Sequence, residues 1–194
     1  MDIAVYGGSF SPVHYGHLAV ASGVIDNSLA DEVWMLPCRR NPLKDVDPVW
    51  ADETRLDMLG KATEYWEKKH ENKKLKVSCI ELTMPSPSFS YNTFRCLMEK
   101  YPDLNFRLVV GADSYLDFQK WYEWEWLESN LRPIVYPRPG FLLKEVRPGW
   151  TLLEGVETVD ISSTEIRKMI EENKPVVHWM PWLEDKDPIY YGKS

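Results

Sequence analysis

Short apolar runs alternate along the chain with longer stretches in which apolar residues recur at helical spacing. The strand-like runs, most of them apolar on both faces, are 3–6, 32–36, 75–80, 106–110 and 133–136. The stripes at helical spacing are formed by Leu56, Leu59, Ala62 and Trp66 and by Phe94, Leu97, Met98 and Tyr101. Runs of the first kind suit a parallel sheet covered on both sides, and such stripes suit core-facing helices. The pattern predicts an α/β fold with a doubly wound parallel sheet.

Three segments that could carry chemistry directly follow predicted strands. They are Gly7-Gly8, residues 37–44 and residues 111–114. In a doubly wound sheet, ligands bind beyond the carboxyl ends of the strands, where the strand order reverses. We therefore expect the three segments to line one crevice.

Composition limits the classes of protein that the chain can represent. Its 194 residues, 44% of them apolar, suit one well-filled domain over residues 1–194. The net charge of −7 and the lack of a basic stripe argue against nucleic-acid binding. No apolar run reaches membrane-spanning length and no leader precedes the first strand, so we expect a cytoplasmic protein without membrane contact. Three cysteines without a CxxC pair suit reduced thiols, and the sequence is compatible with a homo-oligomer.

The first run leads into Gly-Gly-Ser-Phe-Ser-Pro-Val-His-Tyr-Gly-His over residues 7–17. Glycines allow the backbone to approach a polyphosphate, and a following helix offers N–H donors and the positive end of its dipole. A helix over 15–25 would place His14 and His17 on one face. A plain turn and a metal site are alternative interpretations. Zinc is the weaker one, because His70 and His178 stand in no ligand-like spacing to this pair.

A second segment, residues 161–167, reads Ile-Ser-Ser-Thr-Glu-Ile-Arg. Ser162 followed three residues later by Glu165 has the form of a capping box and predicts a helix start. Capping alone would explain the serines if Arg167 and the first motif were absent.

Together these segments resemble the motifs of the nucleotidylyltransferase superfamily, and in detail those of bacterial nicotinate mononucleotide adenylyltransferases. Residues 7–17 resemble that family's GGTFDPxHxGH, and residues 161–167 match its ISSTxIR. Gly-Ala-Asp-Ser at 111–114 and Trp-Tyr-Glu at 121–123 are similar to its GADS and WYE segments. The resemblance extends over almost the whole chain. It implies a Rossmann-like fold and an adenylyltransferase of NAD biosynthesis that joins nicotinate mononucleotide and ATP to give deamido-NAD and pyrophosphate.

The resemblance also implies site residues and partners. The residues implied in catalysis are His14, His17, Lys44 and Arg167. Those implied to bind ATP are Gly7, Gly8, Ser9, Phe10, His17, Gly111, Asp113, Ile161, Ser162, Ser163 and Arg167. Those implied to bind the mononucleotide are Ser90, Trp121, Tyr122 and Arg138. The partners are ATP and nicotinate mononucleotide, with Mg²⁺ arriving bound to ATP and no metal ligand in the protein.

Some positions depart from the family pattern. Around Lys44 the chain has Asn-Pro-Leu-Lys where the family often has Pro-Pro-His-Lys, so Arg39 or Arg40 could substitute for it. Ser11 replaces an aspartate and Asn92 an acidic residue. Two alternatives therefore stay open: an enzyme that uses nicotinamide mononucleotide, and a nucleotide-binding module without turnover.

Overall fold

The computed structural model describes residues 1–40, 48–70, 74–141, 143–156 and 159–183. These residues form a sheet of six parallel strands in the order β3-β2-β1-β4-β5-β6. The strands are β1 (Asp2–Gly8), β2 (Glu32–Pro37), β3 (Leu75–Val77), β4 (Asn105–Gly111), β5 (Ile134–Tyr136) and β6 (Thr151–Leu152). The order reverses between β1 and β4, which pair directly. This is the switch point at which a doubly wound sheet binds ligands.

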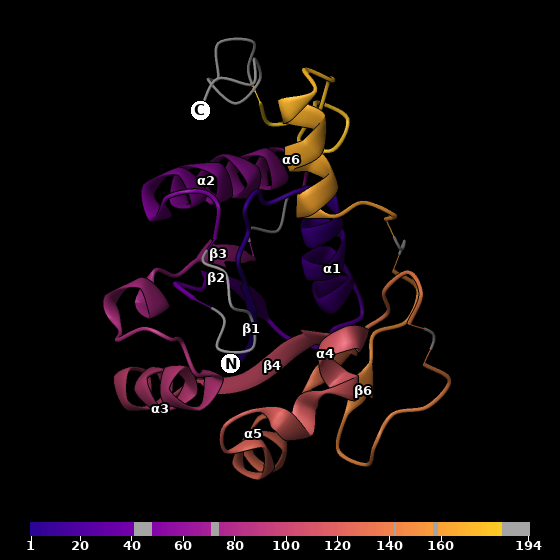
Figure 1. The fold of residues 1–194 in the computed structure, drawn as a ribbon. Coiled ribbons are helices and arrows are strands. Elements are labelled where there is room, and N and C mark those ends of the chain that lie inside the picture. Colours follow the sequence, from indigo (N-terminus) through magenta and orange to yellow (C-terminus); the bar gives the residue numbers. More distant parts are fainter. Residues whose placement is uncertain (41–47, 71–73, 142, 157–158, 184–194) are drawn as a thin grey trace.

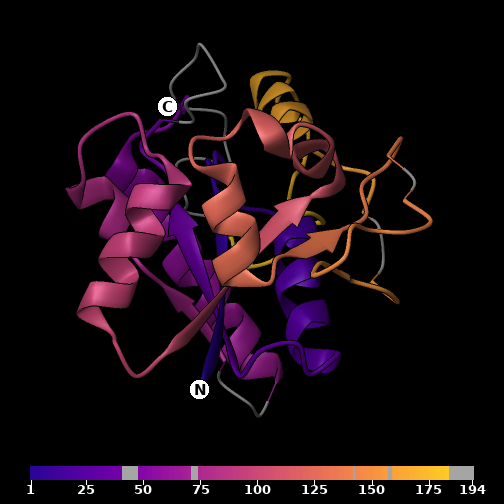
Figure 2. The ribbon, with the colours of Figure 1, turned by 90° about the horizontal axis from the view of Figure 1, so that it is seen from below.

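Helices cover both faces of the sheet (Figures 1 and 2). One face packs against α1 (Tyr15–Asp26), α2 (Asp52–Lys69) and α6 (Ser163–Glu171). The other packs against α3 (Ser90–Lys100), α4 (Ala112–Leu116) and α5 (Trp124–Leu131). The two short 3-10 helices are η1 (Ile80–Thr83) and η2 (Phe118–Lys120). The predicted doubly wound α/β fold is therefore confirmed.

The five predicted strands are present, and one of them ends earlier than its apolar run. The run 75–80 forms a strand only to Val77, the last residue of β3 to pair with β2, and Ile80 already begins η1. The strand β6 has no counterpart among the predicted runs. Of the helical stripes, Leu59, Ala62 and Phe94 are buried in the core as expected. In the part of the chain described here, none of the helices has the length and apolar character needed to cross a bilayer.

Candidate active site

The loop after β1 brings its backbone close to a buried ring. A Cβ on Gly8 would lie 3.1 Å from the ring of Phe10, which is closer than side chains ordinarily approach, so this position favours glycine. The Phe10 ring is fully buried, edge-on to Tyr6 and His17, and its residue takes a φ of +43°. That conformation is unfavourable for a bulky residue and is maintained by the packing of its ring. Phe10 can therefore offer a ligand its backbone only, whereas Gly7 is exposed.

The two histidines form the first turn of α1. His14 is the N-cap residue, and its backbone N–H donates to Nδ1 of His17 at 3.1 Å. The ring centroids of His14 and His17 lie 3.9 Å apart. Because Nδ1 of His17 accepts this hydrogen bond, the proton of its neutral ring resides on Nε2. His17 is thereby fixed as a donor through Nε2.

Burial keeps both imidazoles neutral at physiological pH. Desolvation, followed by the positive charge of Arg138, lowers the pKa of His14 to about 4. Desolvation, followed by the neighbouring His14 and Arg138, places the pKa of His17 well below its ordinary value. The unliganded site therefore presents neutral N–H donors.

The start of α6 docks onto the loop that follows Phe10. The Ser163 hydroxyl donates to the carbonyl oxygen of Pro12 at 2.9 Å, and Nη1 of Arg167 donates to the carbonyl oxygen of Ser11 at 2.6 Å. Ser162 caps the helix: its Oγ accepts from the Glu165 N–H at 3.2 Å, as the capping box predicts. Two segments about 150 residues apart thus meet beside the histidine pair.

An ion pair follows β4 and β5 at the same end of the sheet. Arg138 donates to Oδ2 of Asp113 at 2.8 Å, and a Cβ on Gly111 would lie 2.5 Å from Oδ1 of Asp113. Oδ1 is buried and has no hydrogen-bond partner among the described residues. Since an unpaired buried acceptor is costly, this oxygen is suited to a hydroxyl donor from a ligand. The structure brings Arg138 to Asp113 and near the histidines, while its predicted contact with the mononucleotide stays a prediction.

The residues predicted for the mononucleotide lie around the start of α3 and the segment before α5. Ser90 is the first residue of α3, and the ring of the preceding Phe89 packs against Tyr122, with centroids 5.4 Å apart. Tyr122 is 53% exposed, so its ring is open to a ligand. Trp121 instead packs against the core residue Phe118 with its Nε1 buried and unpaired within the described structure. A cavity of about 170 Å³ adjoins this region, lined by residues 84–89, 92 and 93.

Two buried charged residues beside these loops belong to none of the motifs. Arg55 is fully buried on α2 and Glu81 is 6% exposed on η1. Arg55 lies on the face of α2 that carries Met58, Leu59 and Ala62. Arg55 directly precedes the predicted core stripe and lies one turn before its member Leu59, and this spacing is the only signal in the sequence for its burial. Nothing in the sequence pattern indicates the burial of Glu81.

Lys44 lies outside the described residues. Ile161 is half-buried and packs against the core, just ahead of the Ser162 cap. No three His, Cys, Asp or Glu side chains gather as metal ligands would in the ranges that the structure describes.

Comparison with known proteins identifies the class. The chain belongs to the cytidylyltransferase-like family, whose sequence model matches residues 5–169. Within that family the chain resembles nicotinate-nucleotide adenylyltransferases. A probable nicotinate-nucleotide adenylyltransferase of Bacteroides thetaiotaomicron is 37% identical over 181 residues, which cover 93% of this chain and 87% of the relative. The corresponding protein of Flavobacterium psychrophilum is 34% identical over 93% of this chain and 92% of its own length.

Solved structures support the fold. The nicotinic acid mononucleotide adenylyltransferase of Plasmodium falciparum complexed with NaAD superposes with a TM-score of 0.77 at 23% identity, covering 98% of this chain and 93% of its own. The same enzyme complexed with APC gives a TM-score of 0.74. The family model and the curated relatives confirm the predicted family, and these solved structures confirm its Rossmann-like fold.

Proposed function

We propose that this chain transfers the adenylyl group of ATP to nicotinate mononucleotide, giving deamido-NAD and pyrophosphate. The observation that carries the proposal is the contact of α6 with residues 7–13, called the glycine loop below. Ser163 and Arg167 make this contact beside the buried pair His14 and His17. Both segments carry donors for phosphate oxygens, and they belong to the two motifs that identify the family. The curated relatives that match almost the whole chain have this name.

The reaction needs positioned donors more than a base. An oxygen of the mononucleotide phosphate attacks the α-phosphorus of ATP in line with the bond from that phosphorus to the oxygen that bridges to the β-phosphate. This bond breaks, and pyrophosphate leaves. Charge develops on the α-phosphate and on the leaving group, so donors already in place lower the barrier. His17, fixed as an Nε2–H donor by the backbone of His14, suits the α-phosphate. The remaining N–H groups of Arg167 suit the β and γ phosphates, and the hydroxyls of Ser162 and Ser163 would serve the same phosphates after turning away from Glu165 and Pro12.

The remaining contacts divide between the two substrates. The unpaired Oδ1 of Asp113 suits a ribose hydroxyl. The exposed ring of Tyr122 and the hydroxyl of Ser90 suit the pyridine ring and its carboxylate, and Trp121 would add a flat indole face after a small rearrangement of its packing. Magnesium would enter as part of the ATP complex, held by phosphates and water. Such an enzyme would act in the cytoplasm, with residues 1–194 as one catalytic domain.

Pyrophosphate release from ATP with each of two acceptors tests the proposal. We expect turnover with nicotinate mononucleotide at a kcat/KM at least tenfold above that with nicotinamide mononucleotide, because the ring substituents differ by one charge. The reverse preference would identify the nicotinamide enzyme. Tight ATP binding without turnover of either acceptor would identify a binding module, the alternative raised by Ser11 and Asn92.

A further inference from the structure

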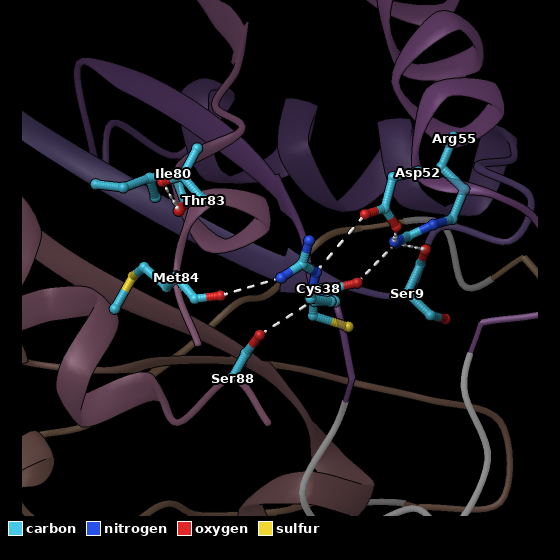
Figure 3. Close-up of polar contacts among 9 residues, drawn as sticks. Ser9, Cys38, Asp52, Arg55, Ile80, Thr83, Met84 and Ser88 are labelled. Atoms are coloured by element: carbon cyan, nitrogen blue, oxygen red, sulfur yellow. Dashed lines mark hydrogen bonds and ion pairs between the residues drawn. The ribbon is translucent and has the colours of Figure 1, made fainter. Parts of the chain in front are cut away.

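Arg55 is a fully buried arginine whose hydrogen bonds join the two loops at the carboxyl ends of β1 and β2. Its Nη1 donates to the carbonyl oxygen of Ser9 at 2.8 Å and to that of Cys38 at 2.7 Å. Its Nη2 pairs with Oδ1 of Asp52 at 2.5 Å, one turn earlier on α2. Figure 3 shows Arg55 between Ser9, Cys38 and Asp52. A buried guanidinium is tolerated only with such partners, so the two loops and the start of α2 are held as one unit.

The hydrogen bond to Ser9 orients a peptide plane of the glycine loop. Carbonyl and N–H of one trans peptide point in opposite directions. With the Ser9 carbonyl held by Arg55, the N–H of Phe10 faces away from α2. This N–H belongs to the loop whose backbone donors are proposed to receive the ATP phosphates.

The hydrogen bond to Cys38 extends the unit toward the cavity beside α3. The backbone N–H of Cys38 donates to the Gly8 carbonyl at 2.9 Å, and two residues later the Arg40 carbonyl accepts from the N–H of Ser88 at 3.0 Å. Ser88 and Phe89 line the cavity, and Ser90 follows them in the chain as the first residue of α3. Residues 38–40 therefore connect the glycine loop to the wall of the region proposed for the mononucleotide, and Arg55 fixes one end of that connection.

We propose that Arg55 is a positioning residue for adenylyl transfer, which sets the glycine loop and the wall of the mononucleotide region at the separation that in-line attack requires. The inference rests on the proposed function. Arg55 is inaccessible to substrate, so its effect is exerted through the two carbonyls. Displacement of reacting groups by about 1 Å can lower a rate by about 10²-fold. Loss of the hydrogen bonds from Arg55 to the carbonyls of Ser9 and Cys38 should therefore lower mainly kcat.

The chain contains a matched control for the loss of a buried arginine. Arg107 lies on β4, 9% exposed, and donates to the carbonyls of Arg132 and Leu29 and to the hydroxyl of Thr151. It holds three segments together as Arg55 does, but near the amino end of its strand, away from the proposed site. A purely structural role for Arg55 predicts that replacing either arginine has the same effect on kcat and on thermal stability.

The test compares Arg55→Met, Arg55→Lys and Arg107→Met by kcat, by KM for each substrate and by thermal unfolding, with kinetics measured below the unfolding range. Arg55→Met should lower kcat about 100-fold with KM for ATP changed less than fivefold. Arg55→Lys, which keeps the charge and some donors, should recover about tenfold of that loss and so keep a kcat about tenfold below the wild type. Arg107→Met should lose a similar degree of thermal stability and keep kcat within threefold of the wild type.

Equal kcat losses in the two methionine variants, or a wild-type kcat in either Arg55 variant, would overturn the inference. If Arg55→Met does not fold, Arg55→Lys decides: a kcat reduced about tenfold in a folded protein supports the positioning role, and an unchanged kcat refutes it. A wild-type protein without turnover of either mononucleotide overturns the proposed function and this inference together. An active wild type with indistinguishable Arg55 and Arg107 variants overturns the inference alone.

Discussion

Glu81 carries its carboxyl group into the interior between η1 and α3, and its replacement by glutamine should change how stability depends on pH. The Thr93 hydroxyl donates to Oε1 at 2.8 Å, and the Ser88 hydroxyl also bonds the carboxyl group. Desolvation outweighs these two hydrogen bonds and raises the pKa of Glu81 from 4.5 to about 7. Glu81→Gln keeps the shape and one acceptor oxygen while removing the ionisation.

The difference between the pKa of Glu81 in the folded and in the unfolded chain sets the size of the stability change. In the folded chain Glu81 retains its proton up to about pH 7, whereas in the unfolded chain it loses the proton near 4.5. Its contribution to stability is therefore complete below pH 4.5, falls as the pH rises and is lost above about pH 7. The difference in pKa corresponds to roughly 3 kcal/mol. Relative to the wild type, Glu81→Gln should gain up to that amount between pH 5 and pH 8.

Urea unfolding of both proteins at pH 5, 6, 7 and 8 measures this difference. Glu99→Gln, at an exposed position on α3, is the matched control and should change the unfolding free energy by less than about 0.5 kcal/mol at every pH. A wild-type-minus-variant difference that stays constant from pH 5 to pH 8 would refute the reasoning, because it would mean that Glu81 carries the same charge in the folded and unfolded proteins and that its pKa is not raised by folding.

Two further predictions concern the proposed ATP site. Gly111→Ala would place a Cβ 2.5 Å from Oδ1 of Asp113 and 3.0 Å from Cδ of Arg138. Displacement of this ion pair should raise the Kd for ATP, measured by calorimetry, about tenfold. An unchanged Kd would show that the pair does not contribute to ATP binding. His14 should titrate near pH 4 by NMR, so its ring stays neutral until the pH approaches 4. The stability linked to the lowered pKa of His14 is complete above pH 6.5 and is lost as the pH falls from 6.5 to about 4. A midpoint near 6.5 would contradict the burial of this ring.

The fold could be predicted from sequence because its main signals are local. Runs such as 3–6 and 106–110 are apolar on both faces, and this is the pattern of central parallel strands. The capping box at Ser162 fixes the start of α6 through residues only three apart. By contrast, β6 has two residues and pairs only with β5. Its position depends on tertiary contacts more than on its own sequence.

The parts of the site that escaped prediction depend on burial of charge. Arg55 and Glu81 are of residue types that are mostly exposed, and their partners are carbonyls and hydroxyls of distant segments. No periodicity reveals such contacts. The neutral state of His14 and His17 likewise follows from burial, which for His17 includes packing against Phe10. The charge of Arg138, which is 121 residues further along the chain than His17, adds to it.

The central claim is that the histidine-bearing loop and α6 hold one ATP triphosphate for in-line transfer, with His17 as a donor to the α-phosphate, and the single-turnover rate of His17→Ala tests it most directly. Removal of one donor to a developing charge typically lowers the rate by about 10²–10³-fold. We predict a loss of that size with ATP and nicotinate mononucleotide, while thermal unfolding stays near that of the wild type. His70→Ala, which removes a ring stacked on Trp66 at the end of α2, should keep the wild-type rate. A His17→Ala rate within twofold of the wild type would contradict the account.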